Sequence, residues 1–366
     1  MNSLLLEKRS WKYCNFGNRC SMKDKLTRLY GDRLLSAKLQ RELDGTDHLG
    51  ACVAFVSPGL PSGSLTAGVG VAPERTFHMG SIGKALNGLI YSSMVAEGTL
   101  SGEDTLDKFL PLTGVAAGLV TLESLVTHTS GLPTIGGGRC ASFQSRWRLL
   151  RKKDPQPETL EEFVSHLRKA PVRPKGFHYS NLGGSALGHA LAAADGVSYP
   201  DLIANRIAKP LGCPSLYVPG PGDLELSGDV PGLSIFNTAQ EPWTGEGYAP
   251  AGGVRVSADD MVIILDAILN HPLPGWTSAF TPLNRTDFES SDGLSHSIGA
   301  GWFIQEATGS TGELAWHNGY ANGFGSAIVL DLKNYRGAFV SVLDGSMQVD
   351  TVSTVLSLMK KEDSHC

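Results

Sequence analysis

The sequence has no long basic tract, no apolar run of membrane-spanning length and few cysteines. The formal net charge of −5 gives no sign of binding to nucleic acid or to an anionic membrane, and we expect neither partner. The six cysteines include no C-x-x-C pair, so neither a zinc site nor a disulfide scaffold is favoured. The absence of a His-Glu-x-x-His motif argues against a metalloenzyme, and we expect no cofactor.

The remaining composition is that of a globular protein. Of the 366 residues, 41% are apolar and 18% are charged, which is enough chain for one large or two ordinary domains. The first apolar run, residues 4–6, is far too short for a signal peptide or a membrane span. We therefore expect a cytoplasmic monomer with reduced thiols.

The apolar spacing predicts an α+β fold. Helices are predicted over residues 22–43, 85–97, 121–127, 160–167, 183–194, 202–211, 257–269 and 349–361. Strands are predicted over residues 50–57, 65–71, 301–306, 326–332 and 337–343. Because strands lie near both ends and the middle is mostly helix and loop, we expect an antiparallel sheet formed from both termini, flanked by helices.

This pattern also predicts a division of the chain. Residues 1–22 show no apolar period and are expected to form a loose tail. Residues 23–75 together with 255–361 would form the sheet subdomain. Residues 76–254 would form an inserted, mostly helical subdomain.

A Ser-x-x-Lys motif opens the predicted helix at 85–97. Three residues are just under one helical turn, so Ser81 and Lys84 would share a face. A serine hydroxyl needs a base beside it, and a lysine with a lowered pKa can be that base. The free N–H groups at the helix start would favour an oxyanion. The alternative is that Ser81 only caps the helix and that Lys84 is a solvated surface residue.

Two further motifs can complete such a site. Tyr179-Ser180-Asn181 precedes the predicted helix at 183–194. A tyrosine near a lysine ammonium can have a lowered phenol pKa and then serve as base and later as acid. The asparagine can hydrogen-bond the lysine or a substrate amide. The alternative for Tyr179 is a half-buried aromatic residue with a satisfied hydroxyl.

His317-Asn318-Gly319 is expected just before the strand at 326–332. A histidine there can bind a carboxylate or shuttle a proton, although a surface-loop histidine is the alternative. Gly319 would let a substrate lie against the strand. The next N–H, from Tyr320, could complete an oxyanion hole with that of Ser81.

One charged run stands apart from these motifs. Residues 146–153 hold five basic side chains and no acidic one. We interpret the run as a solvated helix face, with an acidic-substrate site as the alternative.

Together the three motifs resemble a known family. Their order is similar to that of the serine β-lactamase and penicillin-binding protein superfamily. The Tyr-Ser-Asn form resembles its class C β-lactamase-like branch, which also holds D-alanyl-D-alanine carboxypeptidases, esterases and fungal acyltransferases. Further stretches match the segments "LLxHTSGL", "AGGLxSTAxDL" and "GLGW" of that branch, at residues 122–132, 251–260 and 299–302. The resemblance covers roughly residues 24–360.

The resemblance implies a β-lactamase-like fold and a role for each motif. Ser81 would be the acylated nucleophile, Lys84 and Tyr179 the acid–base pair, and Asn181 a residue that orients Lys84 and substrate. His317 stands where true β-lactamases usually have lysine, which puts β-lactam hydrolysis in doubt. Residues 80–83 do not form a Gly-x-Ser-x-Gly elbow, which argues against an α/β-hydrolase.

We therefore predict a serine hydrolase that acts through an acyl-enzyme on a small-molecule ester, thioester or amide. An acyltransferase of secondary metabolism would use the same Ser81, Lys84 and Tyr179. A non-catalytic ligand-binding relative is an alternative of another class, and the presence of all three residues argues against it.

Overall fold

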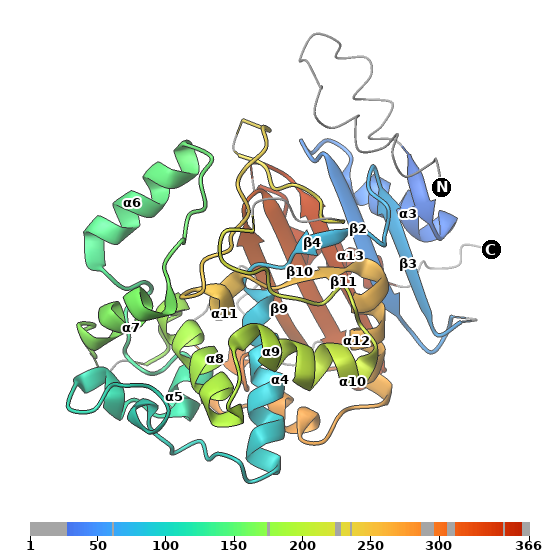
Figure 1. Cartoon of the computed structure of the whole chain (residues 1–366). Coiled ribbons are helices and arrows are strands. Elements are labelled where there is room, and N and C mark those ends of the chain that lie inside the picture. The colour runs from blue at the N-terminus through green and yellow to red at the C-terminus, as the bar shows by residue number, and fades with distance from the viewer. Residues whose placement is uncertain are drawn as a thin grey trace.

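The computed structural model describes residues 28–60, 62–173, 176–223, 228–234, 236–286, 296–305, 312–346 and 348–360. In these ranges nine strands form one antiparallel sheet in the order β1-β3-β2-β11-β10-β9-β8-β7-β6 (Figure 1). Their bounds are β1 (Leu29–Gly31), β2 (Gly50–Val56), β3 (Ser64–Val69), β6 (Asn284–Arg285), β7 (His296–Ile298), β8 (Phe303–Gln305), β9 (Leu314–Ala321), β10 (Phe324–Asp331) and β11 (Arg336–Leu343). A separate two-stranded pair joins β4 (Thr76–His78) to β5 (Arg255–Ser257).

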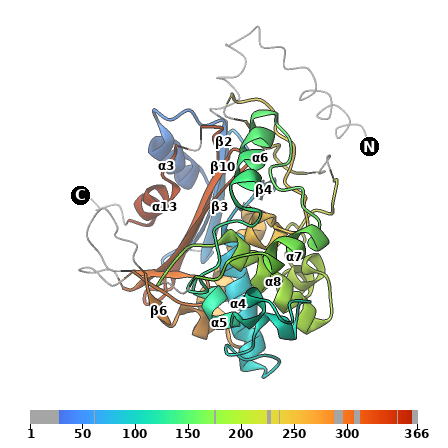
Figure 2. The ribbon, with the colours of Figure 1, turned by 90° about the vertical axis from the view of Figure 1, so that its left-hand side faces the viewer.

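Helices cover both faces of the sheet (Figure 2). On one face lie α3 (Arg33–Leu43) and α13 (Thr351–Met359), and on the other lie α4 (Ile82–Ala96) and α12 (Ala258–Asn270). The other helices are α5 (Leu122–Val126), α6 (Gly138–Leu150), α7 (Leu160–Arg168), α8 (Asn181–Asp195), α9 (Tyr199–Ile203), α10 (Lys209–Leu211) and α11 (Ala249–Gly252). Short 3-10 or π turns are η1 (Leu106–Lys108), η2 (Ala116–Leu119), η3 (Ala204–Ala208) and η4 (Trp276–Phe280).

This architecture confirms the predicted α+β fold, with an antiparallel sheet formed by strands from both ends of the chain. The predicted tail, residues 1–22, lies outside the described ranges. The boundaries of the two predicted subdomains stay a prediction. Within the described ranges, no helix has both the length and the apolar character needed to cross a bilayer.

The predicted helix at 22–43 is wrong at its start. Residues 29–31 form β1, and α3 begins only at Arg33. Gly31 has a φ of +69°, which ends any helical path, and the Asp32 side chain then caps α3 by accepting the Leu35 N–H at 2.8 Å. The leucine spacing continues across this break, which is why the sequence predicted one helix.

The sheet separates two apolar layers because its central strands are buried on both sides. Ala51, Val53 and Phe55 of β2 pack in the layer that contains α3 and α13. The residues between them face the larger layer on the side of α4. This alternation follows from the two-residue period of a strand.

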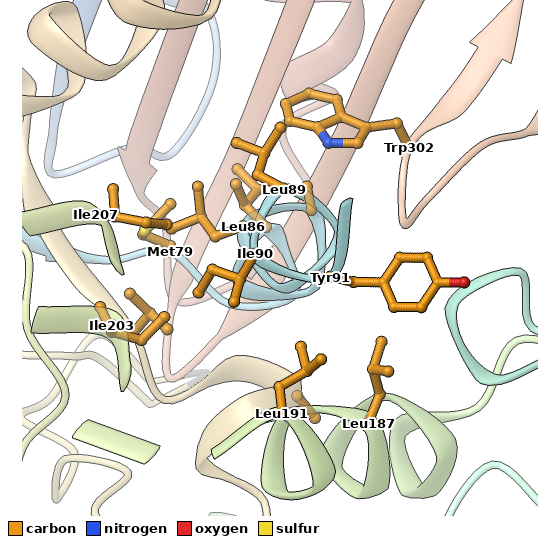
Figure 3. Close-up of a cluster of buried hydrophobic side chains, with 14 of the residues drawn as sticks. Met79, Leu86, Leu89, Ile90, Tyr91, Leu187, Leu191, Ile203, Ile207 and Trp302 are labelled. Atoms are coloured by element: carbon orange, nitrogen blue, oxygen red, sulfur yellow. The ribbon is translucent and has the colours of Figure 1, made fainter. Parts of the chain in front are cut away.

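Helix α4 runs through the larger layer and is buried on almost every side. Figure 3 shows Leu86 and Ile90 of α4 among Leu187 and Leu191 of α8, with Trp302 on another side. A helix that is apolar all round belongs inside a protein. The residue that precedes α4, Ser81, is therefore held on a rigid element.

One glycine of α4 is required by this packing. A Cβ at Gly88 would clash with the carbonyl oxygen of Ala300, in the segment that leads into β8. We expect Gly88→Ala to lower the free energy of unfolding by about 1–3 kcal/mol, because overpacking outweighs the gain in helix propensity. Denaturant unfolding measures the change. Gly59→Ala is the control, since a Cβ there meets only the Ser57 Oγ, at 4.0 Å, and equal losses in both variants would contradict the prediction.

Candidate active site

Ser81 lies at the N-terminal end of α4, and its side chain makes no capping hydrogen bond. Its Oγ instead accepts a hydrogen bond from Lys84 Nζ at 3.0 Å. The Lys84 side chain is only 3% exposed. The alternative prediction, a capping serine beside a solvated lysine, is therefore wrong.

The Lys84 amine lies in an apolar setting without a compensating anion. Burial lowers its pKa to about 7. Nζ also donates to the carbonyl oxygen of Ala251 at 2.6 Å, and no carboxylate forms an ion pair with it among the described residues. A neutral amine keeps two N–H bonds and one lone pair. It can therefore donate to Ala251 while accepting the proton of Ser81.

Tyr179 lies against both of these residues. Lys84 Nζ is 5.0 Å from the centre of the tyrosine ring. Burial raises the pKa of the Tyr179 phenol to about 12, and a hydrogen bond with Ser81 acts in the opposite direction. The prediction of a lowered phenol pKa is therefore wrong. Burial removes more stabilising hydration from the phenolate than the hydrogen bond with Ser81 replaces. Tyr179 is therefore a protonated donor at neutral pH.

His317, Gly319 and Tyr320 lie within strand β9, not in a loop before a strand as the sequence predicted. A two-residue turn, Asn322-Gly323, links β9 to β10, and both turn residues have positive φ. The residues that flank such a turn form a hydrogen-bonded pair, so the pairing alternates along β9. By this alternation, the backbone N–H of Tyr320 points away from β10.

The edge of β9 that Tyr320 faces is open. The pairing between β8 and β9 ends at Phe303 and Trp316, so no described strand lies beside residues 317–321 on that side. The turn before α4 approaches this edge. A Cβ at Gly80 would lie 2.8 Å from the Tyr320 nitrogen, and a Cβ at Gly319 would lie 2.7 Å from the Ser81 nitrogen. The N–H groups of Ser81 and Tyr320 therefore lie close together at one open edge.

The His317 side chain faces the same region but is buried. It is 1% exposed, and its ring centre lies 5.4 Å from that of Phe303 and 6.4 Å from that of Tyr179. Burial, and then the charge of Lys84, lower its pKa to about 3. Its Nδ1 lies 2.7 Å from the carbonyl oxygen of Asn318 and must donate there. His317 is therefore neutral near pH 7.

Comparison with known proteins decides the family. The beta-lactamase family model matches residues 35–357. The chain belongs to the beta-lactamase family. The chain is 28% identical over 207 residues to a beta-lactamase of Psychrobacter immobilis, covering 54% of this chain and 46% of that protein. It is 28% identical over 174 residues to the D-alanyl-D-alanine-carboxypeptidase/endopeptidase AmpH of Escherichia coli (strain K12), covering 43% and 42% of the two chains. The chain thus spans less than half the length of these curated relatives.

Solved structures of this family share the fold. A class C beta lactamase from Rhodobacter sphaeroides superposes with a TM-score of 0.69 at 20% identity, covering 89% of this chain and 98% of that one. A beta-lactamase/D-alanine carboxypeptidase from Pseudomonas syringae gives 0.71 at 16% identity, covering 90% and 100%. These findings confirm the resemblance inferred from the motifs.

In this beta-lactamase family member, the structure shows no hydrogen bond between the Asn181 side chain and Lys84 among the described residues, and the role of Asn181 in orienting Lys84 stays a prediction. Asn181 is the first residue of α8, and its backbone N–H donates to Thr134. Its Oδ1 is buried and has no hydrogen-bond partner among the described residues. The Lys84 Nζ instead donates to the carbonyl oxygen of Ala251 and to Ser81 Oγ. A contact between Asn181 and substrate stays a prediction.

Sequence reasoning assigned no role to Ala251 or to His128. The His128 ring lies 4.5 Å from the Tyr179 ring, centre to centre, and its Nδ1 accepts the Ser180 N–H at 3.3 Å. Burial and the nearby Lys84 hold the pKa of His128 well below its usual range. Both residues stand in stretches that carried the resemblance, 122–132 and 251–260, and those stretches were the available signal.

The aromatic side chains near the site differ in their burial. Tyr248 and Trp302 are 1% and 0% exposed and belong to the core. Trp243 is half-buried and packs against Gly252, close to the turn before Ser81. A cavity of about 10 Å³ lies beside Lys84, a volume that suits one water molecule at most. Among the described residues, no group of three or more His, Cys, Asp or Glu side chains is placed to hold a metal ion.

The pKa of Lys84 sets an expected pH dependence for the reactivity of Ser81. The amine accepts a proton only when it is neutral, so labelling of Ser81 by a fluorophosphonate should rise from about pH 6 to about pH 8 and then level off. The measurement is the labelling rate as a function of pH. Lys84→Met should remove most of the labelling, whereas Lys108→Met, at an exposed lysine on η1, should leave the curve unchanged. A flat profile in the unaltered protein would contradict Lys84 as the base.

Proposed function

We propose that this protein is a serine hydrolase that forms an acyl-enzyme at Ser81 with a small-molecule ester or amide. The observation that carries the proposal is the contact between Ser81 Oγ and a buried Lys84 amine with a pKa of about 7. A lysine kept without a carboxylate partner is costly to bury and adds nothing to stability. Such an arrangement is typical of a functional base.

Acylation would proceed from the neutral amine. Lys84 Nζ takes the proton of Ser81 as Oγ attacks the substrate carbonyl carbon. The carbonyl oxygen becomes an oxyanion and accepts hydrogen bonds from the N–H groups of Ser81 and Tyr320. The geometry that supports this step is the approach of the Gly80 turn to the open edge of β9.

Tyr179 would act as the acid. With its pKa raised to about 12, the phenol is protonated and can give its proton to the leaving oxygen or nitrogen. Lys84 then returns the proton taken from Ser81 to the phenolate. In hydrolysis of the acyl-enzyme, water takes the place of the Ser81 hydroxyl as the attacking group. Ser81 Oγ is then the leaving group, and it regains its proton. His128, whose ring lies against Tyr179, would hold the phenol in position.

The charge of the site narrows the substrate. His317 is neutral and Lys84 is largely neutral above pH 7, so the site offers little positive charge to a carboxylate. We infer that the preferred acyl donor carries no carboxylate beside the scissile bond. This favours neutral esters and amides over β-lactam antibiotics, whose recognition uses such a group.

The first test is acylation of Ser81 followed by intact mass. Neutral aryl esters and acyl thioesters should give an acyl adduct on the unaltered protein, a chromogenic cephalosporin should give less, and Ser81→Ala should give no adduct with any of them. Ser93→Ala is the control, because it removes another hydroxyl from α4, one that donates to the carbonyl of Pro274. Faster loss of the adduct with added alcohols or amines, with formation of their acyl products, would identify an acyltransferase. Absence of any adduct, including with a fluorophosphonate, would indicate a binding protein instead.

The substrate preference is tested with a matched pair of esters. We expect an ester that bears a carboxylate near the scissile bond to acylate Ser81 at least about tenfold more slowly than its neutral counterpart. The reason is that no positive charge in the site offsets the free energy needed to remove the carboxylate from water. His317→Lys should narrow that ratio. His178→Lys is the control, because it adds a lysine immediately before the catalytic Tyr179 but outside β9. Equal rates for the two esters in the unaltered protein would refute the inference.

A further inference from the structure

Helix α6 carries an apolar stripe on its outer face. Phe143, Trp147 and Leu150 follow one another at spacings of four and three residues, and they are 69%, 48% and 56% exposed. The rings of Phe143 and Trp147 are stacked, with centres 6.5 Å apart and planes at 12°. In Figure 1 the helix projects from the body of the molecule. Three large apolar side chains in line on a projecting helix form an exposed patch of the kind that is typical of interaction sites.

Cationic side chains flank this stripe. Residues 138–153 contain six arginines and lysines and no acidic residue, although the whole chain has a net charge of −5. At 100° per residue, Arg146 lies on one side of the stripe and Arg151 on the other. The Arg151 guanidinium lies 4.8 Å from the centre of the Trp147 ring. Of the cations near the stripe, Arg146, Arg151 and Lys152 form no ion pair with any described residue.

Hydrogen bonds attach the inner side of α6 to the rest of the protein. Arg148 Nε donates to the carbonyl of Asp154 at 2.6 Å, and the Asp154 carboxylate accepts the Thr244 N–H at 2.8 Å. Thr244 follows Trp243, which lies beside the turn before Ser81. A groove of about 620 Å³ separates α6 from α7, and its charged groups pair locally, as Glu158 does with His166 at 3.1 Å. Trp147 lines one side of this groove, whereas Phe143, Leu150, Arg146 and Arg151 do not line it.

We propose that α6 docks this protein on an anionic lipid surface. Phe143, Trp147 and Leu150 would enter the interface, and Arg146 and Arg151 would contact the headgroup phosphates. Aromatic and leucine side chains bordered by arginine, on a convex helix, fit a continuous surface that is apolar below and anionic above. An acidic protein would match the charges but offers no reason for the exposed apolar line. The expectation of no membrane partner was based on the charge of the whole chain, and α6 has the opposite sign.

The proposal does not depend on the reaction at Ser81 and is tested by co-sedimentation with vesicles. The intact protein should bind phosphatidylcholine vesicles that contain phosphatidylserine, and bind pure phosphatidylcholine vesicles about tenfold less well. Raising the salt concentration should weaken binding, because it screens the arginines. Phe143→Ser/Trp147→Ser/Leu150→Ser and Arg146→Glu/Arg151→Glu should each reduce binding by about tenfold or more.

The control is Leu119→Ser, which removes a leucine of η2 that is 72% exposed. This variant should bind vesicles as the unaltered protein does. A denaturant midpoint equal to that of the unaltered protein shows that each variant keeps the fold. Binding that is equal for both kinds of vesicle, or that survives both α6 variants, would overturn the proposal. So would the absence of binding to either vesicle, and retention on an acidic polypeptide alone would then indicate a protein partner.

Discussion

The burial of the Lys84 amine without an anionic partner is the constraint on which the site depends. Desolvation brings its pKa to about 7, and this makes the amine a base at the pH where the protein would work. A carboxylate in contact would restore the charge and remove that ability. Among the residues that the structure describes, the hydrogen-bond partners of the amine are two dipoles, the Ser81 hydroxyl and the Ala251 carbonyl. The apolar packing around α4 therefore serves the chemistry as well as the stability of the fold.

Glycine brings the two halves of the site together. The turn before α4 and strand β9 are distant in sequence, and they touch through Gly80 and Gly319, where neither could carry a side chain. Gly80 also has a φ of +57°, which favours glycine over other residues. A Cβ at either position would push β9 away from the nitrogen of Ser81. Close backbone approach is thus the physical basis for two neighbouring N–H donors.

The sequence was sufficient for the fold class and for bringing Ser81, Lys84 and Tyr179 together. The fold follows from apolar periods that are strong in α4, β10 and β11, and the site from three short motifs in a family order. It was not sufficient where the outcome depends on distant packing. The strand around His317 looks like a loop because glycine and asparagine interrupt it, and only pairing with β10 makes it a strand. The direction of the pKa shift of Tyr179 also depends on burial, which no local motif reveals.

The same burial limits the total charge beside Ser81. His317 and Lys84 face one region, and the charge of Lys84 lowers the pKa of His317 further, so the two cannot both be charged at neutral pH. His128 experiences the same effect from Lys84. Near pH 7 the pKa values of His128 and His317 are lowered so far that both rings favour the neutral form, and Lys84 is the one of these three groups whose charge changes there. A lysine in place of His317 would add a second ammonium and favour the neutral form of Lys84 still more, but it would also attract carboxylates. The histidine keeps the basic Lys84 without adding a second charge at neutral pH, and the proposed preference for neutral substrates is based on that difference.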